Sequence, residues 1–206
     1  MINITSLFGL EIKLIEFFLV NITEQFGLRE LSRKMGIDYK LIYVAVQKLI
    51  KKNVLITEKK ANLSLCSLNL KGELTYIQFV EMIRRDKFFQ KHKDFEVFFQ
   101  NVFDKIKYIH FTLIIFGSFV NGKENKESDL DLLILAPKRE ISEEIQRLIN
   151  SESVLLKRKI HSITLNEEEF MSNLSDKKLN VVVEAFKNHI LITGIESFYN
   201  GVKKEI

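Results

Sequence analysis

The chain has 206 residues, of which 46% are hydrophobic and 28% charged, and a formal net charge of +4. This composition is that of an ordinary globular protein, long enough to bury one good core or two small ones. No apolar run approaches the ~18 residues of a membrane span, and the N-terminus lacks the basic start of a signal peptide. The single cysteine, Cys66, excludes an internal disulfide and a cysteine-rich metal site. We therefore expect a cytoplasmic protein without a membrane partner.

Helical periodicity dominates the first third of the chain. Residues 7–21 predict a first helix, and residues 28–35 predict a short second one. Gly36 then supplies a turn, and Asp38 is a suitable N-cap for a third helix that ends near residue 53. Residues 54–57 and 63–66 are predicted to be two short strands joined by a basic turn. Between residues 28 and 60, nine lysines and arginines against three acids leave a net charge of +6.

The order of these elements resembles a winged helix-turn-helix, and the spacing of Leu31, Met35, Gly36, Ile42 and Val46 is similar to that of many prokaryotic regulators. The resemblance implies binding to double-stranded DNA, with the third helix in the major groove. The residues that it places on DNA are Lys40, Tyr43 and Gln47 for bases and Lys48, Lys51, Lys59 and Lys60 for phosphates. The alternatives are a basic face that is only solvated, and a winged helix that contacts protein.

Residues 71–107 are predicted to form a helical connector of one long helix or two. Phenylalanines recur there from Phe79 to Phe103, several of them three or four residues apart. Such an aromatic stripe forms either a core or a dimer seam. We expect a homodimer packed through this connector, which would match a two-fold-symmetric DNA operator.

The most informative motif follows the connector. An apolar run over residues 111–116 ends at Gly117-Ser118, and after a gap of ten residues an apolar strand carries Asp129 and Asp131. Side chains two apart on a strand point to the same face, so the two carboxylates can hold one or two cations together. Hard divalent cations prefer such oxygen ligands and often share them with substrate phosphates. A Gly-Ser turn lets the backbone approach a phosphate closely. The motif therefore predicts a metal-dependent nucleotide site.

This motif resembles the signature of the minimal nucleotidyltransferases, which are relatives of DNA polymerase beta. The resemblance implies a nucleoside triphosphate, with ATP the first choice, held through Mg²⁺ or Mn²⁺ by Asp129 and Asp131. It also implies transfer of a nucleoside monophosphate to an acceptor. The residues that it places on the nucleotide are Gly117, Ser118, Gly122, Lys123 and Ser128. The alternative is a plain βαβ turn with an accidental pair of aspartates.

The rest of the chain predicts a helix over residues 140–150, a strand over 159–165, a helix capped by Asn166 and a helix over 179–186. An ending like Asn188-His189, followed by apolar residues and glycine, is frequent in prokaryotic proteins that fuse a winged helix to a minimal nucleotidyltransferase. The predicted fold is thus α+β, with a winged helix in residues 1–70, the connector, and a small mixed sheet flanked by helices in residues 108–206.

One departure from the family pattern bears on catalysis. Polymerase-type transfer uses a third carboxylate on a later strand, and residues 158–165 contain no acid. His161 or Lys159 stands at the expected position, where a lysine would repel a second cation and a histidine is a poorer Mg²⁺ ligand. We therefore assign the catalytic positions to Asp129, Asp131 and His161, and expect nucleotide binding to survive this loss better than transfer.

Three functions remain open from the sequence. The first is an active nucleotidyltransferase in which the winged helix serves as a tether or an autoregulator. The second is a degenerate sensor in which nucleotide occupancy tunes DNA binding. The third is an antitoxin-like protein that neutralises a toxin partner by nucleotidylating it.

Overall fold

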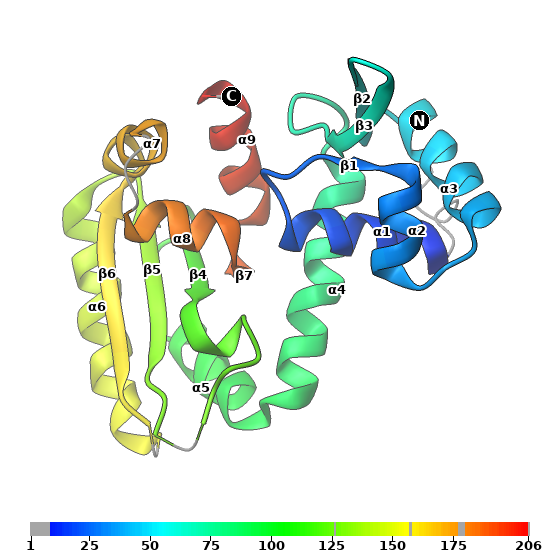
Figure 1. Cartoon of the computed structure of the whole chain (residues 1–206). Coiled ribbons are helices and arrows are strands. Elements are labelled where there is room, and N and C mark those ends of the chain that lie inside the picture. Colours follow the sequence, from blue (N-terminus) through cyan, green and yellow to red (C-terminus); the bar gives the residue numbers. More distant parts are fainter. Residues whose placement is uncertain (1–8, 126, 157, 177–179, 206) are drawn as a thin grey trace. The chain divides into compact units, whose positions relative to one another are not determined.

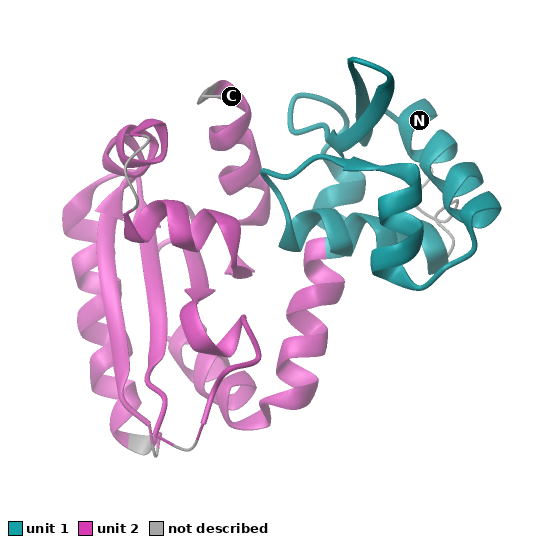
Figure 2. Ribbon diagram, viewed as in Figure 1, with its two compact units in different colours: residues 1–80, 206 teal, residues 81–205 magenta. Residues whose placement is uncertain are grey.

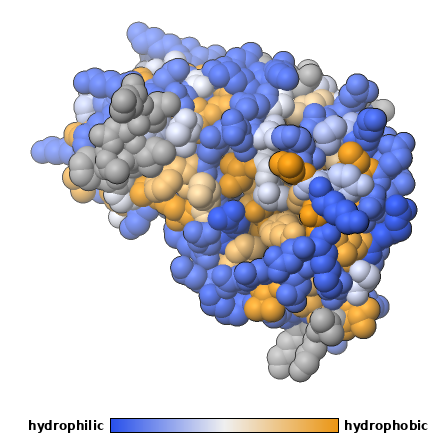
Figure 3. Space-filling model, turned by 180° about the vertical axis from the view of Figure 1, so that it is seen from behind, coloured by the Kyte–Doolittle hydropathy of each residue, from blue (hydrophilic) through white to orange (hydrophobic). Residues whose placement is uncertain are grey.

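The computed structural model of the chain describes residues 9–125, 127–156, 158–176 and 180–205 (Figure 1). These residues fall into two compact units, one up to Val80 and one from Glu81 to Glu205 (Figure 2). Residues 7 and 8 of the first predicted helix, and residue 179 of the last, lie outside this range. Within it, the helices are all too short or too polar to cross a membrane. The face seen in Figure 3 is mostly hydrophilic, with scattered apolar areas.

The first unit contains three helices, α1 (Gly9–Val20), α2 (Leu28–Met35) and α3 (Tyr39–Lys51). Their ends follow from local chemistry. Gly36 terminates α2 in the left-handed region at φ +64°, and the Asp38 carboxylate caps α3 by accepting a hydrogen bond from the backbone N–H of Lys40 at 2.9 Å. The three helices predicted from the sequence are therefore confirmed.

A three-stranded antiparallel sheet completes this unit. Its strands are β1 (Phe26–Gly27), β2 (Leu55–Lys60) and β3 (Leu63–Leu68), in the order β1-β3-β2. The predicted β2–β3 ribbon is present but longer than predicted, because Lys60 pairs with Leu63 and the turn shrinks to two residues. The sequence did not predict β1, since two residues are too few for a periodic pattern.

The predicted connector consists of two helices, α4 (Thr75–Lys91) and α5 (Lys93–Phe103), and the boundary between the units falls within α4. The phenylalanines of this segment lie mostly inside the second unit. Phe95, Phe98 and Phe99 are buried in the hydrophobic core of the second unit, together with Phe88. These rings therefore belong to the core of this unit, and the homodimer stays a prediction.

A four-stranded mixed sheet forms the centre of the second unit. Its strands are β4 (Thr112–Phe116), β5 (Leu130–Ala136), β6 (Ile160–Asn166) and β7 (Ile190–Thr193), in the order β6-β5-β4-β7. Only β5 and β6 run parallel, and the crossover between them contains α6 (Arg139–Glu152) and the 3₁₀ turn η3 (Ser153–Leu155). The chain as described is thus an α+β protein with two sheets.

Helices cover both faces of this sheet. On one face α5 and α6 bury the alternate residues Leu113 and Ile115 of β4 and Leu132 and Ile134 of β5. On the other, α8 (Val181–Lys187) lies opposite α6 (Figure 1). Two further helices pack near the same strands, α7 (Glu167–Ser175) and α9 (Ile195–Glu205). β7 and α9 are not among the elements predicted from the sequence.

Candidate functional site

The Gly117-Ser118 turn lies directly against one of the predicted aspartates. β4 ends at Phe116, and the chain enters the 3₁₀ turn η2 (Gly117–Phe119) with Gly117 at φ +73°. A Cβ atom at this position would stand 2.3 Å from Oδ2 of Asp131. Glycine is therefore required here twice, once for the left-handed backbone and once for the close approach of the carboxylate.

The two aspartates lie at the start of β5. Asp131 is paired with Phe116 on one side and with His161 on the other. Asp129 immediately precedes the strand, and Leu130 between them is fully buried. Because side chains alternate along a strand, Asp129 and Asp131 share the face opposite Leu130. Asp129 is exposed and the Asp131 side chain is 28% exposed, so the carboxylates are open to a ligand.

His161, one of the two residues that the sequence offered at the position of a third carboxylate, lies next to Asp131. It is the register partner of Asp131 on the parallel strand β6, and its Nδ1 lies 3.4 Å from Oδ1 of that aspartate. Its side chain is 67% exposed. Lys159 comes just before the strand, and its carbonyl accepts a hydrogen bond from the N–H of Leu130 at 2.9 Å. Of the two candidates, His161 is thus the register partner of Asp131, whereas Lys159 precedes the first register pair, Leu130 with Ile160.

This donor set suits one hard cation better than two. Among the described residues, no group of three or more histidine, cysteine or acidic side chains gathers as a metal site. Two carboxylates can still hold one Mg²⁺ whose remaining ligands are water and phosphate oxygens. A second such ion would meet the nitrogen of His161 instead of a carboxylate oxygen. The residues fit a single cation shared with a nucleotide.

The loop between the turn and the aspartates is tied down by contacts that the sequence did not predict. The Arg158 guanidinium donates to the carbonyl of Asn125 at 2.9 Å and stands over the Phe119 ring, 5.3 Å from its centroid. Glu124 forms an ion pair with Lys91 at the end of α4. These partners lie 33 residues away along the chain in each case, so no local pattern could reveal them.

The three further predicted nucleotide-binding residues all lie in this loop. Gly122 is exposed, with φ +63°, and apart from its chain neighbours no described residue has an atom within 4 Å of the position that a Cβ would take. Lys123 is exposed as well. The Ser128 hydroxyl, in contrast, accepts a hydrogen bond from the N–H of Asn125 at 2.9 Å. Ser128 therefore shapes the loop, whereas Gly122 and Lys123 remain accessible to a ligand.

The predicted DNA-contacting residues gather on α3 and β2 of the first unit. Lys40, Tyr43 and Lys51 are exposed, and Gln47 is half-buried. Lys48 is less available, because its ammonium lies 3.7 Å from the carboxylate of Glu11, a buried acid that also binds Lys52 at 2.6 Å. On β2, Lys59 and Lys60 are exposed, and Lys60 donates to the side chain of Gln25 at 2.8 Å.

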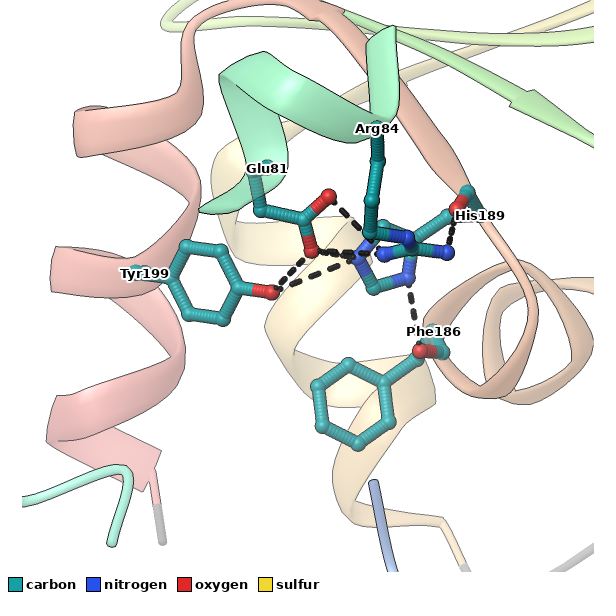
Figure 4. Close-up of polar contacts among 5 residues, drawn as sticks. All are labelled: Glu81, Arg84, Phe186, His189 and Tyr199. Atoms are coloured by element: carbon teal, nitrogen blue, oxygen red, sulfur yellow. Dashed lines mark hydrogen bonds and ion pairs between the residues drawn. The ribbon is translucent and has the colours of Figure 1, made fainter. Parts of the chain in front are cut away.

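A buried polar cluster in the second unit was also missed by sequence reasoning. Glu81, Arg84, His189 and Tyr199 are joined by hydrogen bonds and ion pairs (Figure 4). Although burial raises the pKa of Glu81, the opposing effects of Arg84, His189 and Tyr199 prevail and lower it to about 2. His189 thus has a structural role, because it anchors the start of β7 to α4 and α9.

Comparison with known protein families gave a match within the second unit. Residues 99–192 match the family model described as the nucleotidyltransferase domain. The matched segment contains β4, β5 and β6, and with them Gly117, Asp129, Asp131 and His161. Neither the curated proteins nor the solved structures gave a significant match to the chain.

Proposed function

We propose that the second unit binds a nucleoside triphosphate together with one Mg²⁺ or Mn²⁺ ion, ATP being the first nucleotide to test. The observation that carries this proposal is the contact between the Gly117 backbone and the Asp131 carboxylate. It brings a turn suited to phosphate next to a ligand suited to a cation, and the nucleotidyltransferase domain match covers both.

Each residue of the site then has a role. Asp129 and Asp131 would hold the cation, and the Ser118 hydroxyl with the backbone N–H groups of its turn would bind the phosphates. Gly122 and Lys123, exposed in the following loop, would face the same phosphates. A bound cation would supply charge neutralisation at the phosphate oxygens.

Transfer of the nucleoside monophosphate should be slow in this protein. The acceptor hydroxyl needs a base within hydrogen-bond reach, and a second cation normally lowers its pKa. His161 offers a nitrogen beside Asp131 but neither the charge nor the oxygen ligands of a carboxylate. This substitution therefore favours a protein that binds nucleotide and transfers it only weakly, as a sensor would, rather than a fast nucleotidyltransferase.

We further propose that the first unit is a winged helix that binds duplex DNA. Three helices, the Gly36 turn between α2 and α3, and the sheet order β1-β3-β2 support this assignment. In such a module α3 would enter the major groove, and the β2–β3 ribbon would follow the backbone. The exposed Lys51 and Lys59 are the best-placed phosphate contacts, since Lys48 is engaged with Glu11.

Two radiolabels on ATP test the nucleotide site and separate the three functions. The protein is incubated with Mg²⁺ or Mn²⁺ and a cell lysate, using ATP labelled at the α-phosphate in one sample and at the γ-phosphate in another. Protein labelled only by the α-label indicates nucleotidyl transfer, and transfer to one small partner favours the antitoxin role. Binding without transfer, with a change in DNA affinity, favours the sensor. If the protein binds no nucleotide with either Mg²⁺ or Mn²⁺, the proposal is wrong.

A further inference from the structure

The outward face of α3 carries apolar side chains among its lysines. Leu41 is 57% exposed and Val44 is 50% exposed, while Ile42, Ala45, Val46 and Leu49 form the buried stripe of the same helix. Leu41, Val44 and Gln47 are spaced three residues apart, so they form one row across the outward face. Isolated exposed apolar residues need no explanation, but a row on the helix assigned to DNA reading does.

The surroundings of this row indicate what covers it. Lys40 and Lys51 are exposed on the same outward face, and α2 and β2 add further basic residues from Arg29 to Lys60. A partner must therefore offer negative charge around the row and apolar groups at its centre. Duplex DNA does both, because the thymine methyl is the apolar group that the major groove presents between phosphates.

We propose that α3 reads consecutive A·T pairs in the major groove, with Leu41 and Val44 against thymine methyl groups and the Gln47 amide on adenine. This inference rests on the proposed DNA binding of the first unit and adds the class of sequence that it selects. Six residues of helix rise by about 9 Å, which spans about three base pairs at 3.4 Å each. Glutamine forms paired hydrogen bonds with the edge of adenine, and branched aliphatic side chains pack on the thymine methyl.

Synthetic duplexes test this reading without knowledge of an operator. Binding of the 206-residue chain is measured by fluorescence anisotropy at fixed low salt with four duplexes of equal length, dA·dT, dA·dU, dG·dC and dI·dC. Replacing thymine by uracil removes only the methyl group, and we expect it to weaken binding about fourfold per contacted methyl. The dI·dC duplex resembles A·T in the minor groove and G·C in the major groove, so it should bind no better than dG·dC.

A matched pair of variants assigns the effect to one side chain. Val44→Ala should bring the ratio of dA·dT to dA·dU affinity towards one while leaving the dA·dU affinity unchanged. Val20→Ala is the control, because Val20 is 53% exposed near the end of α1 and lies outside α3. It should leave all four affinities as in the wild type. Both substitutions remove exposed methyl groups, and circular dichroism verifies that both variants are folded.

Four outcomes would overturn the inference. Equal wild-type affinity for dA·dT and dA·dU would exclude methyl reading, and an unchanged ratio in Val44→Ala would exclude this residue as the reader. Binding of dI·dC as tight as that of dA·dT would indicate minor-groove or shape recognition. Failure to retain any duplex would end the DNA-binding proposal itself, and would favour a protein partner for the apolar row.

Discussion

Replacing Gly117 by alanine should damage the nucleotide site, because the added methyl group would meet the Asp131 carboxylate. At φ +73° an alanine costs about 1–2 kcal/mol relative to glycine. The added Cβ would also lie 2.3 Å from Oδ2 of Asp131, far inside van der Waals contact. Because β5 holds Asp131 between two paired strands, the carboxylate must rotate away or the turn must shift. Such overpacking costs about another 1–3 kcal/mol.

Gly122→Ala is the matched control for the backbone cost. Gly122 has a similar φ of +63° in the following loop, but within the part of the chain that the structure describes only its chain neighbours come within 4 Å of its Cβ position. We therefore expect Gly122→Ala to lower the free energy of unfolding of the second unit by about 1–2 kcal/mol. Gly117→Ala should lower it by about 2–5 kcal/mol, the sum of the backbone cost and the overpacking cost.

Urea denaturation of both variants measures the difference, and isothermal titration calorimetry with Mg·ATP measures its effect on binding. Gly117→Ala should weaken Mg·ATP by about tenfold or more, since it displaces one of two carboxylate ligands. Gly36→Ala, at φ +64° in the first unit, should leave the nucleotide affinity unchanged. Equal stability of Gly117→Ala and Gly122→Ala, together with wild-type Mg·ATP affinity of Gly117→Ala, would refute the predicted clash with Asp131.

Three further predictions concern the remaining features of the chain. His161→Asp should raise the rate of nucleotidyl transfer, measured with α-labelled ATP, by about tenfold or more; a slower variant would mean that His161 itself acts as the base. Lys51→Gln should reduce the slope of log K against log salt in DNA binding by about 1. Lys48→Gln should change this slope less, because Lys48 lies 3.7 Å from Glu11, and equal changes in slope would contradict this prediction. Because the pKa of Glu81 is lowered to about 2, its ionised carboxylate stabilises the folded state fully above about pH 4.3, and this stability declines as the pH falls towards 2. Glu81→Gln should flatten this part of the acid-denaturation profile, and an unchanged profile would show that other groups cause it.

The sequence predicted those parts of the fold that follow from local patterns. The helices α2 and α3, their Gly36 turn and the Asp38 cap depend on residues within one or two turns of one another, and all are present. The same holds for the Asn166 cap of α7, whose side chain accepts from the N–H of Glu169 at 2.7 Å. Short or late elements such as β1 and β7 were missed, because two to four residues carry no period.

The same distinction between local and long-range features applies to the candidate site. Asp129 and Asp131 could be identified because the face that they share is fixed by strand alternation alone. The contact of Gly117 with Asp131 and the position of His161 depend on which strands become neighbours. The resemblance suggested the position of His161, whereas the contact of Gly117 was not predicted. The ties of Arg158 and Lys91 to the loop, and the pairing of Lys48 with Glu11, join residues more than 30 positions apart and required the folded chain.

The central claim is that two carboxylates and a Gly-Ser turn bind a nucleotide through a divalent cation. Calorimetric titration of ATP into the 206-residue chain, with and without Mg²⁺, tests it most directly when repeated on the Asp129→Asn, Asp131→Asn double variant. We expect binding by the wild type only when Mg²⁺ is present, and none by the double variant. ATP affinity that is the same in both proteins and independent of Mg²⁺ would contradict the account.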